Sequence, residues 1–254
     1  MNTFSIRETL RFAWIAFRKY PWAHISIAFI FIITAIVSGS KSAIIGLLGS
    51  IAMFIFKVGY IDVVLKSLEG EKPRLNLFER GWMHKDKFWR FFLGSAIILL
   101  MAYAPFVITL LVFLGFIGVS AFGPDSIAAL FTSTTALVLI AFFLLSTIIL
   151  FYVTIRYAFF GFVLIDRNLS VKQSLKESAK LMKGHGWKYL SFLAVLGLIL
   201  LIPAITIIGI LLVIPFSALA QGYVYRKLEG RTPTLGTAIE IPPEMHPVAE
   251  AQPQ

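Results

Sequence analysis

The chain of 254 residues contains no cysteine, and only 14% of its residues are charged. The lack of cysteine excludes disulfides, thiol chemistry and cysteine-ligated metal sites. The scarcity of charge leaves too little polar surface to cover a water-soluble globule, because 58% of the residues are hydrophobic and the mean hydropathy is +0.85. These features predict an integral membrane protein.

Long apolar runs are what the chain has instead. A helix of roughly 20 mostly apolar residues crosses about 30 Å of hydrocarbon. The runs predict an all-α, polytopic helix bundle of about six transmembrane helices, near residues 22–39, 43–66, 88–118, 134–160, 187–204 and 207–227. The third and fourth runs exceed a straight span, so we expect them to tilt, to continue along the interface, or to bend at Pro105 or Gly161.

Acidic residues are the scarcer charged class, with 13 against 23 basic residues and a formal net charge of +10. All but two basic residues lie before the first run, in the second and fourth connections or at the boundaries of these connections, or near the end of the last run; the exceptions are Lys41 and Lys57. Lys and Arg concentrate in cytoplasmic loops of membrane proteins. The pattern predicts a multi-pass protein of the cell (inner) membrane with both termini in the cytoplasm.

The first 21 residues lack the small-residue cleavage site of a signal peptide, so we expect the first run to remain as an anchor. The last residues, 230–254, are proline-rich and have no core-forming pattern. We interpret them as a disordered cytoplasmic tail behind a transmembrane domain of residues 1–229, with a partner-binding peptide as the alternative.

Residues 5–25 and 170–190 are related by a shift of 165 positions, which places Ser5 on Ser170 and Trp22 on Trp187. Each segment has the serine and the Glu8 or Gln173 of a capping box. Each predicts an amphipathic helix in the headgroup layer, with an apolar arc beside a basic flank. The arcs comprise Ile6, Leu10, Trp14 and Phe17, and Val171, Leu175, Ala179 and Met182. The expected headgroup ligands are Arg7, Arg11, Arg18, Lys172, Lys176, Lys183, Trp22 and Trp187.

A second pair of matching segments, Leu68-Glu69-Gly70 and Leu228-Glu229-Gly230, marks where two of these units end. The unit is then an interfacial helix, a hairpin of two spans and a Gly-Pro exit. We expect three parallel units, at about 5–75, 76–169 and 170–235, although the middle lead-in LNLFERGWMHKDKF matches the others poorly.

The stretch RYAFFGFVLIDRNLSVKQSLKESAKLMKGHGWKYL resembles a family of small six-helix bacterial and archaeal membrane proteins. That family is related to the membrane domain preceding some glycerophosphoryl diester phosphodiesterases. The shared positions are Arg156, Asp166, Ser174, Leu175, Ser178, Leu181, Gly184 and Trp187. The resemblance implies a six-helix membrane fold. It implies no phosphodiesterase activity, because that chemistry belongs to a separate soluble barrel for which this chain has no room.

Catalysis and metal binding lack a basis in the sequence. The four histidines, His24, His84, His185 and His246, have no ligand spacing, and three of them lie in or next to basic interfacial segments. No glycine-rich phosphate loop is present. We therefore expect no enzymatic activity, no metal and no cofactor.

Polar side chains within the expected spans are costly and are default functional candidates. The candidates for substrate binding are Lys57, Tyr60, Arg156, Tyr157 and Gln221. Two interpretations stay open. They anchor or pair locally, as Lys57 with Asp62, or they line a polar cavity in the cytoplasmic half.

Two hypotheses of function follow. The first is a non-enzymatic membrane protein that organises lipids or membrane partners through its basic interfacial helices. The alternative is a transporter or exporter of a small anionic or amphipathic substrate. The expected partners are membrane lipids, especially anionic ones, and a membrane protein or a second copy of the chain. Nucleic acid is disfavoured, because the dispersal of basic residues along a membrane face already explains their excess.

Overall fold

A computed structural model describes residues 4–73, 85–120, 133–231 and 233 of the chain. Within these ranges α-helix is the only regular structure, which confirms the all-α class. The helices are α1 (Ile6–Lys19), α2 (Pro21–Ser38), α3 (Ala43–Leu68), α5 (Lys85–Ser120), α7 (Ser133–Arg156), α8 (Phe160–Arg167), α9 (Val171–Leu181), α10 (Gly186–Ala204) and α11 (Ile207–Leu228).

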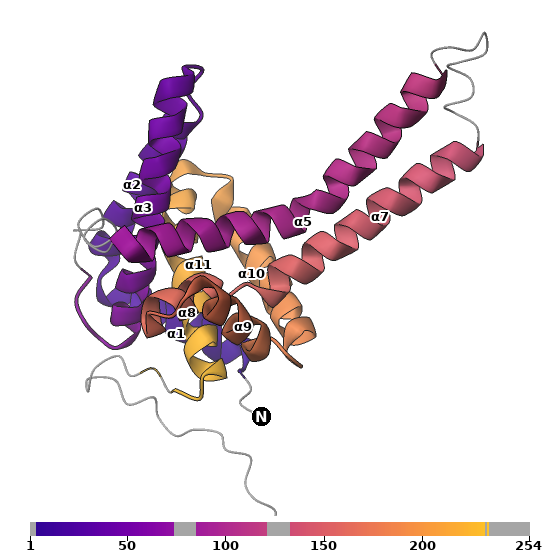
Figure 1. Ribbon diagram of the computed structural model, residues 1–254. Helices are drawn as coiled ribbons and strands as arrows, with labels where there is room; N and C mark the ends of the chain where they lie inside the picture. Colours follow the sequence, from indigo (N-terminus) through magenta and orange to yellow (C-terminus); the bar gives the residue numbers. More distant parts are fainter. Residues whose placement is uncertain (1–3, 74–84, 121–132, 232, 234–254) are drawn as a thin grey trace, which may run out of the picture.

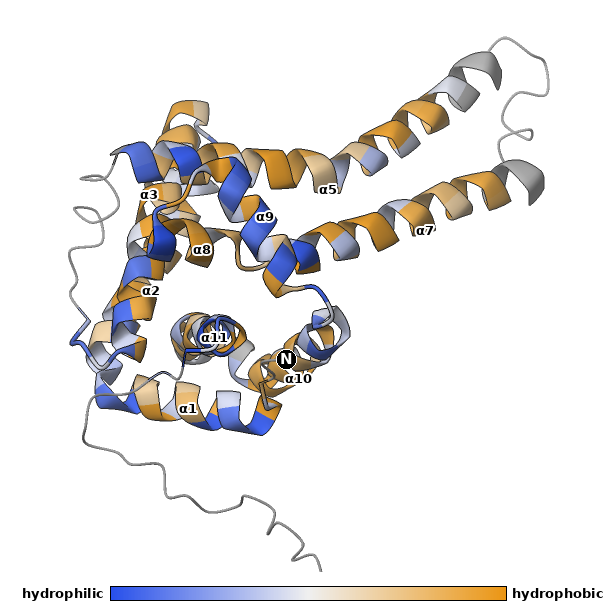
Figure 2. Cartoon of the chain, turned by 60° about the horizontal axis from the view of Figure 1, so that its bottom comes forward, coloured by the Kyte–Doolittle hydropathy of each residue, from blue (hydrophilic) through white to orange (hydrophobic). Residues whose placement is uncertain are grey.

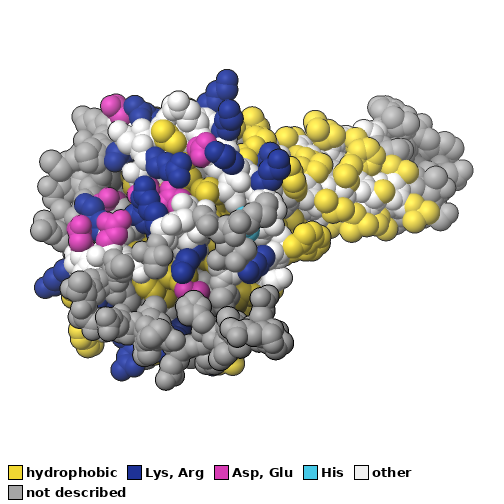
Figure 3. Space-filling model, turned by 90° about the horizontal axis from the view of Figure 1, so that it is seen from below, with side chains coloured by type: hydrophobic (Ala, Val, Ile, Leu, Met, Phe, Trp, Pro, Cys, Tyr) yellow, Lys and Arg dark blue, Asp and Glu magenta, His cyan; other side chains and the backbone are white. Residues whose placement is uncertain are grey.

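The long helices pack in sequential pairs, α2 on α3, α5 on α7 and α10 on α11. The three pairs rise from a common base, where the short helices α1, α8 and α9 lie (Figure 1). Hydrophilic residues are concentrated at this base, and the residues of the long pairs are mostly hydrophobic (Figure 2). We call the face of the base seen in Figure 3 the basic end; Lys and Arg side chains gather there among fewer acidic ones.

Five helical stretches are long and apolar enough to cross a membrane: Pro21–Ser38, Ala43–Leu68, Asp86–Gly115, Leu137–Arg167 and Gly186–Pro203. They indicate a multi-pass membrane protein. The sixth expected run forms α11 but is not among the five, and Gln221, Arg226 and Lys227 make its last turns polar. A sixth span therefore stays a prediction.

The two longest runs depart from straight helices in different ways. In α5 the helix continues through Pro105 and changes direction along its length (Figure 1). The fourth run breaks at residues 157–159, where α7 ends and α8 begins, before the expected bend at Gly161. Gly161 serves packing instead, because a Cβ atom there would lie 2.9 Å from atoms of Ile61 and Phe91.

The core lies around α11, which packs against α1, α2, α3 and α10. Tyr223, Val224 and Tyr225 of α11 are almost fully buried in it. In the most apolar part of the α5 span, by contrast, only 6% of the residues are buried within the described protein. In a membrane the exposed face of α5 meets lipid tails. The buried core of the protein therefore lies near the basic end, around α11.

Candidate lipid-headgroup interface

Helix α1 lies against α11 with one side and exposes the other. Its buried residues are Thr9, Phe12, Ala13, Ala16 and Phe17. Its exposed side carries Arg7, Arg11, Trp14 and Arg18. These four positions follow one another at intervals of three or four residues, so they form a single row along the helix. We call this row the arginine stripe.

Helix α9 packs on α8 and α5 through small side chains. Ser174 and Ser178 are fully buried, and the Ser178 hydroxyl donates to the carbonyl oxygen of Arg156 at 3.4 Å. That carbonyl is at the last residue of α7, where a helix lacks its own partners. Lys172 and Lys176 point outward and are exposed.

The most buried positions of the two helices correspond under the 165-residue shift. Thr9 and Ala13 of α1 are fully buried, as are Ser174 and Ser178 of α9. The apolar arcs expected from the sequence lie beside these faces, and only Phe17 and Met182 of the arcs are buried. Hydrophobicity alone missed these most buried positions, because three of the four side chains carry a hydroxyl group. Ile6, Leu10, Val171 and Leu175 of the arcs pack against the core while only partly buried. The repeat itself stays a prediction, and the lead-in of its middle unit is mostly outside the described residues.

All eight expected headgroup residues are exposed. Trp22 and Trp187 are 79% and 85% exposed. None of the six basic side chains, Arg7, Arg11, Arg18, Lys172, Lys176 and Lys183, makes an ion pair or a side-chain hydrogen bond with the part of the chain that the structure describes. Their donors are therefore available to an external acceptor.

The two expected capping boxes have different outcomes. At Ser170 the box is complete: the Gln173 amide donates to the serine hydroxyl at 3.4 Å, and the Gln173 side chain accepts from the Ser170 amide at 3.2 Å. At Ser5 the prediction is wrong, because the side chain caps nothing. Glu8 instead accepts a hydrogen bond from Tyr223 and pairs with Lys227 at 2.9 Å. A charged partner on α11 outcompetes a neutral backbone amide.

The Glu8 carboxylate joins α1 to α11. Partial burial raises its pKa, but the hydrogen bonds from Tyr223 and Lys227 and the charge of Lys227 outweigh burial and lower the pKa below 4.5. Glu8 therefore stays ionised at neutral pH, and α1 is held with its arginine stripe facing away from the core.

A network of charged side chains surrounds Arg226 at the end of α11, with Arg226 and Glu229 buried and Glu69 about half exposed. The Arg226 side chain is 4% exposed and contacts Glu69 after α3, Asp166 in α8 at 2.9 Å, and Glu229 at 3.4 Å. Arg167 extends the network through Glu229 at 2.7 Å and Glu177 of α9 at 3.4 Å. Arg226 thus contacts acidic side chains at the ends of three helices, α3, α8 and α11.

Local backbone structure presents Glu69 and Glu229 in the same way. The glycine after each has a left-handed backbone, with φ of 86° at Gly70 and 81° at Gly230. The next amide bonds back five residues, Glu71 to Lys66 at 3.1 Å and Arg231 to Arg226 at 2.9 Å. From the sequence, these Glu-Gly pairs were interpreted as the ends of repeat units. The sequence did not reveal that both glutamates contact Arg226. The available signal for this contact was the glutamate before the glycine in both segments, in a chain with only 13 acidic residues.

The polar residues expected in the spans have separate surroundings. Lys57 is exposed, and its Nζ lies 5.9 Å from the ring centre of Phe91 in α5. Its expected partner Asp62 pairs with Lys66 at 3.5 Å. Tyr60 is buried beside Phe31, and its hydroxyl has no hydrogen-bond partner among the described residues.

Arg156, Tyr157 and Gln221 are all partly buried. The Arg156 guanidinium donates to the Tyr152 hydroxyl at 2.8 Å, one turn back on α7. Tyr157 packs against the core in the break before α8. No hydrogen bond or ion pair within the described ranges joins Lys57, Arg156 and Gln221 to one another.

The histidines also lie apart. His24 of α2 is fully buried next to Phe17, not at the interface expected for it, and His185 is partly buried before α10. His84 and His246 fall outside the described residues. Where side chains are described, no three His, Asp or Glu residues are placed to hold a metal ion.

Fold and surface together define an all-α, multi-pass membrane protein with a cluster of exposed basic side chains at one end. No family model, no curated protein and no solved structure matches the chain. The resemblance to six-helix prokaryotic membrane proteins stays a prediction, and the functional argument depends on the surface itself.

Proposed function

We propose that the protein is a non-enzymatic membrane protein that binds anionic lipid headgroups through α1 and α9. By holding such lipids it organises the lipid or membrane partners around its cytoplasmic face. The observation that carries the proposal is the set of six exposed basic side chains, on these two helices and the turn after α9, that have no partner among the described residues.

Charge balance at the basic end supports this proposal. The acids Glu8, Glu69, Asp166, Glu177 and Glu229 all pair with basic residues inside the protein. They therefore do not neutralise the six exposed Arg and Lys side chains of α1, α9 and the turn after α9. Each basic residue near an anionic membrane surface contributes about 1 kcal/mol of attraction. Guanidinium groups add bidentate hydrogen bonds to phosphate oxygens.

The helix arrangement favours lipid over a soluble partner. Trp22 and Trp187 are exposed where α2 and α10 begin, and tryptophan prefers the headgroup level of a bilayer. Ser26 and Ser191 donate to the carbonyl oxygens of Trp22 and Trp187 at 2.8 and 3.0 Å, so both helices have the same first turn. The basic side chains next to these tryptophans then lie at the depth of lipid phosphates.

The transporter alternative has less support. It requires Lys57, Arg156 and Gln221 to converge on one substrate. Lys57 has its close contact with Phe91, and Arg156 with Tyr152. The lipid-binding proposal needs no such convergence.

Reversal of charge on α9 tests the proposal. In proteoliposomes, energy transfer from tryptophan to dansyl-labelled phosphatidylglycerol, relative to labelled phosphatidylcholine, reports anionic-lipid enrichment. We expect Lys172→Glu, Lys176→Glu and Lys183→Glu together to abolish that enrichment at α9. Lys41→Glu is the control, because Lys41 is exposed in the α2–α3 connection, away from the basic end. An unchanged ratio in the triple variant would remove α9 from the proposal.

A further inference from the structure

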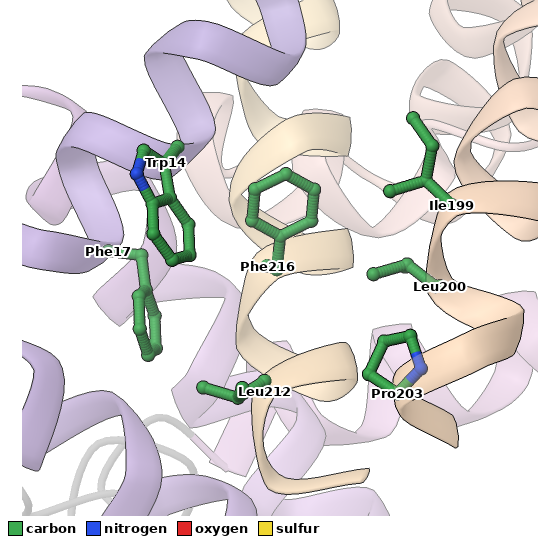
Figure 4. A pocket seen from close by; sticks show the side chains of 7 residues that line it. All are labelled: Trp14, Phe17, Ile199, Leu200, Pro203, Leu212 and Phe216. Carbon is green, nitrogen blue, oxygen red and sulfur yellow. The ribbon is translucent and has the colours of Figure 1, made fainter. Parts of the chain in front are cut away.

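An apolar hollow lies between α1, α10 and α11, next to the arginine stripe (Figure 4). Its volume is about 190 Å³. Trp14 and Phe17 of α1 line one side, Leu200 and Pro203 of α10 the other, and Leu212 and Phe216 of α11 lie between them. A water molecule occupies about 30 Å³ of liquid and a methylene group has a similar size, so the hollow has room for several methylene groups.

The hollow has aromatic walls held in place by their neighbours. The Trp14 ring stacks on Phe17, with ring centres 6.0 Å apart, and meets the edge of Phe216 at 6.4 Å. Phe17 is buried, but Trp14 remains 49% exposed. Because its lining surface is almost entirely apolar, the hollow offers little to water and suits hydrocarbon.

Trp14 connects the hollow to the arginine stripe. Arg11 is three residues before it and Arg18 four residues after it, so both are its neighbours on the helix surface. Both guanidinium groups are exposed and have no partner among the described residues. A cationic pair therefore lies at the rim of a hydrocarbon-sized hollow.

We propose that this hollow is a specific site for one acyl chain of an anionic phospholipid, whose phosphate is bound by Arg11 and Arg18. The inference rests on the proposed function and adds to it a defined binding position. Charge complementarity at the rim selects an anionic lipid, and apolar walls select its chain. The α9 lysines have no part in this site, so the site and the general attraction of the basic end are separable.

Quenching of Trp14 by brominated acyl chains tests the site in the full-length chain. Trp22, Trp82, Trp89 and Trp187 are replaced by Phe, which leaves Trp14 as the fluorophore. Proteoliposomes contain brominated phosphatidylglycerol or brominated phosphatidylcholine at equal mole fractions. We expect the anionic lipid to compete for the site with about fivefold higher relative affinity for each arginine that contacts it. Arg11→Gln with Arg18→Gln should remove this preference.

A filling variant separates the chain site from charge alone. Leu200→Phe reduces the hollow, and we expect it to lower quenching by the anionic lipid to the phosphatidylcholine level. Leu198→Phe is the matched control, because Leu198 is on the same helix, does not line the hollow and is 71% exposed. Equal loss in both variants would overturn the inference.

The other outcomes are equally decisive. Equal quenching by the two lipids would overturn the inference, because a neutral lipid then occupies the hollow as well. No quenching by either would also overturn it, since a protein side chain would then fill the space. An anionic preference that survives Leu200→Phe would refute the acyl-chain site and leave the lipid-binding function standing. Loss of enrichment in the α9 variant concerns only that function.

Discussion

At the scale of single residues, Arg226 is the residue on which the helix ends depend. It is buried among Glu69, Asp166 and Glu229, which come from three separate helix ends. A buried ion pair is weak evidence for net stability, but the removal of one partner leaves uncompensated charge. Loss of the guanidinium would leave only the more exposed Arg167 and Arg231 to offset the repulsion among the three carboxylates.

Replacement of Arg226 by methionine should therefore destabilise the protein strongly. We expect Arg226→Met to lower the free energy of unfolding by about 3 kcal/mol, measured by SDS-induced unfolding in mixed micelles. Arg231→Met is the control, because Arg231 pairs with two of these acids, Asp166 and Glu229, but its side chain is 56% exposed; we expect less than about 1 kcal/mol. Equal effects would show that burial of Arg226 does not govern the network.

Glu8 gives the α1–α11 contact a dependence on pH. Its pKa in the folded protein lies below its ordinary value of 4.5, so its contribution to stability is complete above pH 4.5 and is lost as the pH falls through the lower folded pKa. Glu8 is 42% exposed, so we expect Glu8→Gln to cost less than about 1 kcal/mol at pH 7. The difference between wild type and variant should shrink below pH 4.5. A difference that is constant from pH 7 to 3.5 would contradict this account.

Sequence patterns predicted outward-facing residues better than paired ones. The six basic residues and two tryptophans expected at the headgroups are all exposed, as charge and helical spacing, which are local properties, suggest; their binding of headgroups stays a prediction. The partners of Glu8 were not, because Tyr223 and Lys227 are more than two hundred positions away in the chain. The same pattern, a serine with Glu or Gln three residues later, forms a helix capping box at Ser170 and no side-chain cap at Ser5. Only tertiary contacts decide between those outcomes.

At the scale of helices, small residues determine where neighbours touch. Gly94 of α5 faces α8, and a Cβ atom there would lie 1.9 Å from Cζ of Phe160. At Gly222 of α11 a Cβ atom would lie 2.8 Å from Val64 and 2.9 Å from Leu68 of α3. The sequence predicted helix positions well, because hydropathy runs fix where spans begin and end. It could not identify which glycines were contacts, since that depends on which faces meet.

A pair of glycine substitutions measures this effect. We expect Gly94→Ala to lower stability by about 1–3 kcal/mol, because the buried Phe160 ring must move. Gly197→Ala in α10 is the control, since a Cβ atom there has nothing within 4 Å. That variant should be neutral or slightly stabilised through higher helix propensity. Both are compared by thermal unfolding in one detergent; a Gly94→Ala protein as stable as wild type would contradict the packing described.

At the scale of the whole molecule, the beginning of α1 and the end of α11 lie together, joined by the ion pair of Glu8 with Lys227. This arrangement follows directly if α11 is a sixth span. Hydropathy over the described residues supports five spans, whereas the charge pattern predicts six.

The sidedness of the termini distinguishes these counts. Six spans place both termini on one side of the membrane, and five place them on opposite sides. We expect a reporter that fluoresces only in the cytoplasm to be active at either end of the chain, and an alkaline phosphatase fusion to be inactive at both. A terminus found outside would refute the orientation with both ends in the cytoplasm.

The central claim is that the basic end selects anionic lipid. Its most direct measurement is the relative association of spin-labelled phosphatidylglycerol and phosphatidylcholine with the full chain in proteoliposomes, at low and high salt. We predict a preference for phosphatidylglycerol that weakens with salt. The preference should disappear when Arg7, Arg11, Arg18, Lys172, Lys176 and Lys183 are all changed to Gln. Equal association of both lipids with the wild-type chain, or a preference unchanged in the six-residue variant, would contradict the claim.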